Sequence, residues 1–344
     1  MPSQAGHTGF RYDVRTRSSE PAMSTHPPQP PRVSVALCVY NGEKHLREQL
    51  DTVLAQRGVD LEVIAVDDGS RDGSVALLRE AAARDPRLQV HVNPENLGPL
   101  RSFERAMSLG GGEFVAPCDQ DDRWHPDKLA QLLACIGDAD LAYCDSEYID
   151  DGGRPSGRGI SSDLTMMSGR EPMRFVFSNS VSGHALIVRR ALFEAARPFP
   201  PGLFHDWWLA MCASARGGVA YLDEALVQFR RHDAAFSPLG KDAAQAPPSR
   251  NRVWLEERRA LLRALAGSAF DRDGRAAAML HALEQAEAGR GYGPLLRSVW
   301  QSRAAAPPWR GSTAINALRL QSRFIRKLRR ARKEPPIAGP RFRL

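Results

Sequence analysis

The sequence predicts an α/β protein built on a doubly wound, mostly parallel, Rossmann-like sheet. Short apolar runs, partly β-branched, recur along the first 150 residues, and amphipathic segments of helical period separate them. Polar or glycine-containing turns follow each run, as expected where a strand leads into a helix. With 344 residues, 42% hydrophobic and 25% charged, the chain is long enough for one large α/β domain with appendages or for two small domains.

The apolar runs give the order of the expected elements. Five strands are expected at 33–39, 61–66, 88–92, 113–117 and 141–144. The helices between them begin near Asn41, near Ser70 or Asp72, at Pro99 and near Pro126. The alternation weakens after Asp150, where strands at 181–188 and 226–229 and a helix at 206–215 complete the sheet. Ligands bind such sheets at the carboxyl ends of the strands, so the residues after each strand are the candidates for function.

The two ends of the chain differ from its body. Residues 1–31 are rich in Pro, Ser, Thr and Gln and are expected to be disordered, residues 32–240 form the α/β domain, and residues 241–344 form a helical extension. Helices are expected there at 252–266, 275–288 and 313–333. From Arg303 onward there are 12 Lys/Arg and one acid, Glu334, so this basic tail carries +11, which leaves −4 of the total +7 on the first 302 residues. The negative body excludes nucleic acid along it, whereas the tail suits an anionic surface.

Location follows from what the sequence lacks. No run of about 18 apolar residues occurs, and the N-terminus has no apolar signal-peptide core, so a cytoplasmic protein is expected. Ile315, Leu318, Ile325 and Leu328 lie near one face of the last helix, which would draw the protein to the inner membrane face; a solvated or disordered tail is the equal alternative. The five cysteines have no paired spacing and are expected to be reduced thiols.

Polar residues follow each of the first four strands. They are Tyr40-Asn41, Asp67-Asp68-Gly69-Ser70, Asn96-Leu97-Gly98 and Asp119-Gln120-Asp121-Asp122. Carboxylates as close as those of the last group repel one another, and a hard cation such as Mg²⁺ or Mn²⁺ relieves that repulsion. A solvated acidic loop is the alternative. One of Asp67 and Asp68 is expected to accept a hydrogen bond from a pyrimidine base against the Tyr40 ring, although this segment is also good turn chemistry.

This ordered set of motifs resembles glycosyltransferase family 2, of the GT-A fold, over roughly residues 32–240. The segment Cys118-Asp119-Gln120-Asp121-Asp122-Arg123-Trp124 is similar to the rhamnosyltransferase-like branch. The resemblance implies an inverting, metal-dependent transfer of a sugar, with rhamnose as the first candidate, from a dTDP- or UDP-linked donor. The acceptor would be a saccharide or a lipid-linked glycan in the synthesis of a cell-surface polysaccharide.

The resemblance also implies roles for single residues. Tyr40, Asn41, Asn96 and Asp68 or Asp67 would bind the nucleotide, Arg101 would lie near the diphosphate, and Asp119 would reach the ribose or the metal. Asp121 would be the principal metal ligand. His184 would line the donor and acceptor pocket, His232 in Arg230-Arg231-His232 would reach the diphosphate or the metal, and Asp206 would be the catalytic base. The alternative is that Asp206 simply caps the helix that follows it, a role that is compatible with that of a base.

Two other function classes stay open. A nucleotidyltransferase shares the fold, the nucleotide and the metal, but usually has a glycine-rich loop with a lysine after the first strand, where this chain has Tyr40-Asn41-Gly42-Glu43. A non-catalytic carbohydrate-binding protein would use the same pocket without turnover. Metal-dependent hydrolysis of a nucleotide sugar would separate an enzyme from such a binding protein.

Overall fold

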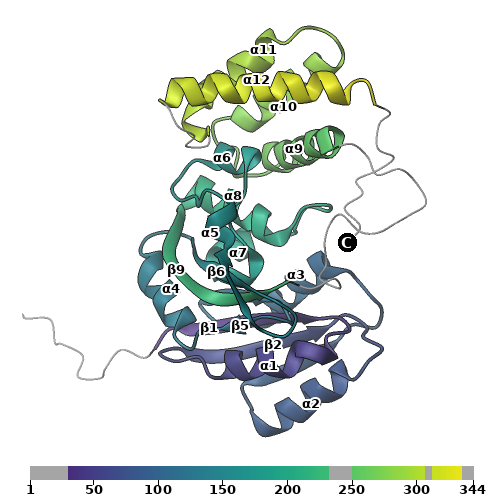
Figure 1. Cartoon of the computed structure of the whole chain (residues 1–344), viewed down its shortest axis with the longest axis vertical. Helices are drawn as coiled ribbons and strands as arrows, with labels where there is room; N and C mark the ends of the chain where they lie inside the picture. The colour runs from purple at the N-terminus through teal and green to yellow at the C-terminus, as the bar shows by residue number, and fades with distance from the viewer. Residues whose placement is uncertain (1–29, 232–249, 307–311, 335–344) are drawn as a thin grey trace, which may run out of the picture. The chain divides into compact units, whose positions relative to one another are not determined.

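The structure is a computed structural model that describes residues 30–231, 250–306 and 312–334. These residues form a nine-stranded sheet with helices on its faces and a layer of helices beyond one end (Figure 1). The strand order is β3-β2-β1-β4-β8-β6-β9-β5, and β7 pairs with β6 outside this path. The predicted α/β fold with a mostly parallel sheet is therefore confirmed.

The first half of the sheet is parallel and alternates with helices as the sequence predicts. Its elements are β1 (Arg32–Val39), α1 (Glu43–Leu54), β2 (Asp60–Asp67), α2 (Ser74–Arg84), β3 (Leu88–Val92), α3 (Pro99–Leu109) and β4 (Phe114–Cys118). The strands β1, β2 and β4 are almost wholly buried, because helices cover both faces of a parallel sheet. Their carboxyl ends therefore meet at one edge.

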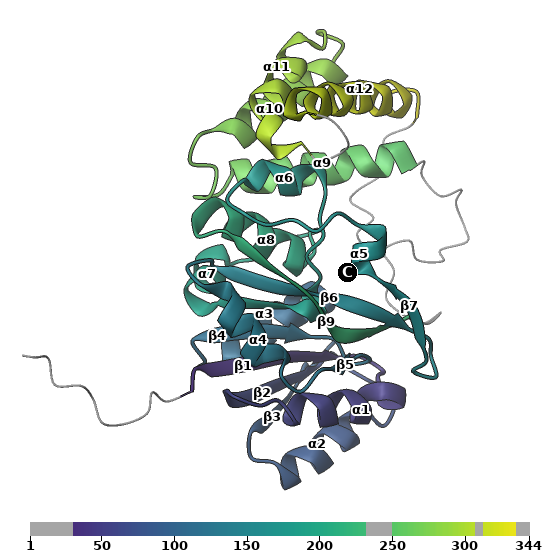
Figure 2. The same ribbon diagram turned by 60° about the vertical axis from the view of Figure 1, so that its left-hand side comes forward.

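The second half departs from simple alternation. It comprises β5 (Arg123–Trp124), α4 (Lys128–Ile136), β6 (Leu141–Ile149), β7 (Pro155–Gly159), α5 (Ile160–Asp163), α6 (Pro172–Phe177), η1 (Gly183–Ala185), β8 (Leu186–Arg189), α7 (Arg190–Ala196), α8 (His205–Arg216) and β9 (Val219–Arg230). The antiparallel strand β8 lies between β4 and β6. Figure 2 shows β9 beside β6, to which it runs parallel. The strands β6 and β9 thus end at the same edge as β1 and β4.

A helical layer follows the sheet. Its elements are α9 (Arg250–Ala266), α10 (Arg275–Glu287), α11 (Gly293–Gln301), η2 (Arg303–Ala305) and α12 (Thr313–Ala331). One hydrophobic core runs from α8 into this layer, where the Phe324 and Trp254 rings meet edge to face at 4.8 Å. The helix α11 was not predicted, because glycines at 289, 291 and 293 interrupt the pattern before it. All five cysteines are unpaired, and no helix among the described residues is long and apolar enough to cross a membrane.

Candidate active site

The loop after β1 is fastened to the loop after β2. The Asn41 backbone N–H donates to Ser70 Oγ at 2.9 Å, and the Arg71 N–H donates to Asn41 Oδ1 at 2.9 Å. Asn41 itself has φ 49°, a conformation that asparagine tolerates better than most residues. It therefore precedes the start of α1 as a turn residue, and the helix begins after Gly42. Beside it, the Tyr40 ring is 49% exposed at the rim of the sheet.

The two carboxylates after β2 have different partners. Asp68 Oδ1 accepts from Asn93 Nδ2 at 2.7 Å and from the Leu97 N–H at 2.8 Å, and Asp68 Oδ2 accepts from the Gly98 N–H at 2.9 Å. Asp67 Oδ1 accepts from two backbone N–H groups of its own turn, while its buried Oδ2 has no partner. Asp68 thus folds the loop after β3, and Asp67 retains an oxygen for another donor.

Two further residues of the predicted nucleotide pocket lie on that loop and on α3. Asn96 is exposed, and its Nδ2 donates to the Asp68 backbone oxygen at 3.0 Å. Arg101 points its guanidinium to Glu104, with 2.6 Å between Nη1 and Oε2, and its side chain is 42% exposed. Both side chains are therefore accessible at the same edge of the sheet as Tyr40.

Three ligand-type side chains come together after β4. Asp119, Asp122 and His184 each offer an atom within 4.8 Å of the others. His184 Nδ1 lies 3.7 Å from Asp119 Oδ2 and 3.9 Å from Asp122 Oδ2. Asp122 is fully buried; its Oδ1 accepts from the Arg230 N–H at 2.9 Å, and its Oδ2 has no hydrogen-bond partner. The structure thus groups Asp122 with Asp119, and Asp121 lies outside this group of three.

The position of His184 is set by contacts on every side. Its Nε2 lies 2.9 Å from Ser146 Oγ, its ring stacks on Phe229 with centroids 4.4 Å apart, and its backbone oxygen accepts from Lys128 Nζ at 2.5 Å. That lysine is fully buried, with Nζ 3.1 Å from the centre of the Trp124 ring. Lys128 therefore places a positive charge beneath the carboxylate group.

The charges of the group act on one another. Burial raises the pKa of Asp122 to about 7, with Asp119 and Asp121 adding to the rise and His184 opposing it. Burial tends to lower the pKa of His184, but the neighbouring Asp122 and Asp119 outweigh it and hold that pKa above its ordinary value. A buried carboxylate with an unused oxygen, next to a second carboxylate and an imidazole, is a set of donors that suits a divalent cation.

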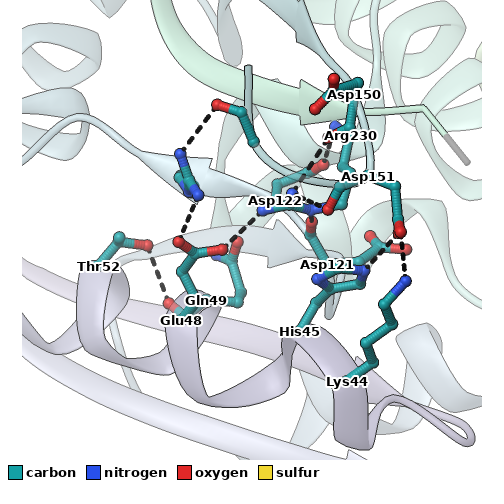
Figure 3. Close-up of polar contacts among 12 residues, drawn as sticks. Lys44, His45, Glu48, Gln49, Thr52, Asp121, Asp122, Asp150, Asp151 and Arg230 are labelled. Atoms are coloured by element: carbon teal, nitrogen blue, oxygen red, sulfur yellow. Dashed lines mark hydrogen bonds and ion pairs between the residues drawn. The ribbon is translucent and has the colours of Figure 1, made fainter. Parts of the chain in front are cut away.

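Arg230 holds the Asp119–Asp122 loop in place (Figure 3). It is fully buried at the end of β9, and its Nε donates to the Asp121 backbone oxygen at 2.8 Å. Its Nη1 donates to the backbone oxygens of Asp150 and Asp151 at 3.2 and 2.9 Å, and its Nη2 donates to Glu48 Oε2 at 2.7 Å. Arg230 is thus a positioning residue with its guanidinium used internally. His232, two residues on, lies outside the described residues.

Asp206 joins the start of α8 to the segment that carries His184. Its Oδ2 accepts from the Gly183 N–H at 3.1 Å and its Oδ1 from the Trp207 N–H at 2.5 Å. Burial raises the pKa of Asp206, although His205 and these N–H groups oppose the rise. The His205 ring stacks on Phe103 with centroids 4.1 Å apart, and burial lowers its pKa. Asp206 thus lies in the first turn of α8, whose N-cap is Phe204, and its carboxylate binds the segment that carries His184; its role as the catalytic base stays a prediction.

Glu48, Ser146 and Lys128 complete the site and were not among the predicted site residues. Glu48 and Lys128 lie on helices, where charged residues usually face solvent. Ser146 lies in the part of β6 beyond the predicted strand. Only Lys128 had a sequence signal, since it follows Trp124 in the segment after the acidic motif.

Comparison with protein families settles the class of the domain. The model described as Glycosyl transferase family 2 matches residues 34–196. Residues 34–196 thus form a family 2 glycosyltransferase domain. The matched stretch runs from β1 to α7, so it contains the loops after β1, β2, β3 and β4 and the Asp119, Asp122 and His184 group.

Several bacterial proteins are similar to this glycosyltransferase chain. EpsH of Bacillus subtilis (strain 168) is 30% identical over 213 residues, which cover 59% of this chain and 56% of EpsH. The glycosyltransferase alr2836 of Nostoc sp., named as uncharacterized, is 28% identical over 236 residues, 65% of this chain and 72% of that protein. The succinoglycan biosynthesis protein ExoO of Rhizobium meliloti is 28% identical over 168 residues, 48% of each chain. The chain thus spans little more than half the length of EpsH.

The fold is shared with a solved structure. The crystal structure of S. aureus TarS 1–349 in complex with UDP-GlcNAc superposes with a TM-score of 0.55, and the match covers 88% of this chain and 90% of that one. The sequence identity is 18%, so the likeness concerns the fold. The glycosyltransferase domain therefore has the predicted GT-A fold.

Proposed function

We propose that this glycosyltransferase moves a sugar from a nucleotide-diphosphate sugar to a hydroxyl of a saccharide or lipid-linked acceptor, with inversion at the anomeric carbon. One observation carries the proposal: the carboxylate of Asp206 is hydrogen-bonded to the N–H of Gly183, the neighbour of His184 in the Asp119, Asp122 and His184 group. A proton acceptor and a cation-binding group are thereby joined at the edge where a parallel sheet binds nucleotides. ExoO is named for succinoglycan biosynthesis, which supports a role in polysaccharide synthesis.

Two observations support the choice of donor sugars. The Cys118 to Trp124 segment resembles the rhamnosyltransferase-like branch, which favours dTDP-rhamnose. TarS, which shares the fold, was crystallised with UDP-GlcNAc, so a UDP-linked hexose is the second candidate. Tyr40 would stack on the base while Asp67 Oδ2, which has no partner in the protein, accepts the N–H of the pyrimidine.

The residues after β4 fit a divalent cation. Asp119 and Asp122 would supply oxygens and His184 would supply Nδ1, and since an imidazole nitrogen suits Mg²⁺ poorly, Mn²⁺ is the better fit. Such a cation, when bound, acts as a Lewis acid toward the departing diphosphate. Asp121, predicted as the principal ligand, stays a prediction; Arg230 holds its backbone next to the group.

The remaining chemistry belongs to the chain's own residues. Asp206 takes the proton from the attacking acceptor hydroxyl, and its raised pKa makes it a stronger base than an ordinary aspartate. The N–H groups of Gly183 and Trp207 fix the direction of that carboxylate. A single displacement with Asp206 as base needs no protein nucleophile, so the anomeric configuration inverts.

The test is a panel of dTDP- and UDP-linked sugars incubated with the protein and Mn²⁺, with release of free nucleoside diphosphate as the measurement. We expect one donor to be hydrolysed slowly without acceptor, and hydrolysis to stop on chelation. Transfer of a nucleotidyl group with release of pyrophosphate would support a nucleotidyltransferase instead. Binding of a saccharide with no turnover of any donor would support the carbohydrate-binding alternative.

We also propose that the cytoplasmic protein is drawn to an anionic membrane surface through α12. Ile315 and Leu318 are 46% and 55% exposed on this arginine-rich helix, whereas Leu328, which the sequence placed on the same stripe, is buried against the helical layer. Liposomes containing phosphatidylglycerol should sediment the wild-type protein, and Ile315→Ser/Leu318→Ser should reduce the bound fraction. Equal binding to neutral liposomes would remove the electrostatic part of the proposal.

A further inference from the structure

A pocket with a cationic wall lies where β6 and β9 end. Its volume is about 530 Å³, and it is lined by Tyr148, Ile149, Asp150, the β7 residues Pro155, Ser156 and Arg158 with the preceding Arg154, and Arg231. Figure 2 shows β7 beside the carboxyl end of β6, with which it pairs in antiparallel fashion. A pocket of this size admits a mono- or disaccharide.

Two of the three arginines in the pocket wall have guanidinium groups that are available to bind a ligand. Arg158 forms an ion pair with Asp163, which also accepts from the Tyr148 hydroxyl at 3.1 Å. The guanidinium groups of Arg154 and Arg231 have no hydrogen bond or ion pair to any side chain in the described part of the chain.

The other groups of the wall fit the same ligand. Arg231 lies over the Tyr148 ring, with its central carbon 5.1 Å from the ring centre. The acid in the wall, Asp150, turns Oδ1 to the Arg154 backbone N–H at 2.9 Å. The pocket therefore presents two unpaired cations beside an aromatic ring.

A row of packed aromatic rings and the buried side chain of Arg230 connect the pocket to the candidate active site. The Tyr148 and Phe229 ring centres are 6.0 Å apart, and those of Phe229 and His184 are 4.4 Å apart. Arg230 binds the backbone oxygens of Asp150 in the pocket wall and of Asp121 in the acidic loop, as Figure 3 shows. A molecule that packs on Tyr148 in the pocket is therefore linked to His184, and so to the Asp119, Asp122 and His184 group, through two successive contacts between aromatic rings.

We propose that this pocket binds a phosphate group carried by the saccharide acceptor. Guanidinium groups from two separate segments, the β7 hairpin and the end of β9, suit a group with three equivalent oxygens, and Tyr148 offers an apolar face to a sugar ring. The assignment to the acceptor rests on the proposed function, whereas binding of a sugar phosphate does not.

The experiment is calorimetric titration of the full-length protein, freed of metal, with glucose 1-phosphate, and with glucose as the neutral probe. Wild-type protein should bind glucose 1-phosphate and show no measurable binding of glucose. Arg154→Ala/Arg231→Ala should weaken binding about tenfold or more, because each charge-assisted contact to phosphate contributes at least that factor. A matched loss of two charges outside the pocket, Arg79→Ala/Arg297→Ala, should bind as the wild type does, since both residues are exposed on α2 and α11.

Three results would overturn the proposal. The first is no binding of glucose 1-phosphate by the wild type up to about 10 mM, which is about ten times the dissociation constant of about 1 mM expected for so few contacts. The second is equal binding by the pocket variant and the wild type, and the third is an equal loss of binding in the control variant. A glutamine pair, Arg154→Gln/Arg231→Gln, repeats the test if the alanine pair lowers the melting temperature. Donor hydrolysis by the wild type is measured separately. Its absence would remove the proposed function and leave the phosphate-binding result intact.

Discussion

Replacing Asp206 with asparagine separates its catalytic role from its structural one. The amide oxygen of the substituted side chain can still accept from the Gly183 N–H, but its NH2 group then faces the Trp207 N–H, so the free energy of unfolding should fall by about 1–2 kcal/mol. The amide cannot take a proton from the acceptor. A general base contributes about 10²- to 10⁴-fold, so transfer should fall by that factor, equivalent to about 3–5 kcal/mol of activation free energy.

The assay is initial-rate sugar transfer under saturating donor, with the melting temperature measured on the same preparation. Because burial raises the pKa of Asp206, the acid limb of the wild-type pH profile should lie above the usual aspartate range, with activity rising as the carboxylate ionises. Asp206→Asn should lack this limb. Asp206→Ala, which loses both acceptors, should in addition be less stable. Transfer by folded Asp206→Asn within about threefold of wild type would refute the assignment and leave Asp206 with a structural role in the first turn of α8.

Five further substitutions, in three experiments, test the surrounding groups. Asp122→Asn keeps an acceptor for the Arg230 N–H but removes a charged ligand, so the Mn²⁺ concentration for half-maximal transfer should rise at least about tenfold; an unchanged value would exclude Asp122 as a ligand. Arg230→Met should lower the unfolding free energy by about 3 kcal/mol in urea denaturation, because it breaks a buried network of charged and polar groups. Glu48→Gln should lower it by less than about 1 kcal/mol, because the Glu48 side chain is 41% exposed. Equal losses in the two variants would contradict the view that Arg230 is the buried centre of the network. Asp68→Asn should mainly lower the melting temperature, and Asp67→Asn should mainly raise the KM for the donor, with the reverse pattern contradicting the division of roles read from their partners.

The sequence predicted that the candidate nucleotide-binding residues lie together because one rule covers their placement. Tyr40, Asp67, Asn96 and Asp119 lie at or just after the ends of different strands, and these strands are parallel, so their carboxyl ends lie at one edge. No contact between these residues had to be known. The same rule places residues near Asp150 and Arg231 at this edge once β6 and β9 are found to share the direction of β4.

Which of Asp121 and Asp122 is buried beside Asp119 and His184 could not be predicted from the sequence, for a physical reason. Both residues lie in one short turn between β4 and β5. A shift of this turn by one residue would bury the Asp121 carboxylate in place of that of Asp122. The observed arrangement, with Asp122 buried, is fixed by the hydrogen bond from the Arg230 N–H to Asp122 Oδ1, between residues 108 positions apart in the chain. His184 was similarly uncertain, because the predicted strand at 181–188 is in fact η1 followed by the short antiparallel β8.

The Arg230 network has a consequence for how the cation would bind. Glu48, the backbone oxygens of Asp121, Asp150 and Asp151, and the Asp122 carboxylate all converge on this one residue, so the acidic loop is held in shape by the protein. Gathering carboxylates normally costs electrostatic energy that a bound ion must offset. Here buried Lys128 supplies positive charge near them, and protonated His184 does so as well until its Nδ1 gives up the proton to bind the cation. A cation would therefore bind a preformed loop, and its effect on the melting temperature should follow mass action on the folded state, with no separate folding step of residues 119–122. Protection of the Asp121 and Asp122 amides from hydrogen exchange should thus be similar with and without Mn²⁺, and a large gain of protection on adding Mn²⁺ would mean that the ion, and not Arg230, orders the loop.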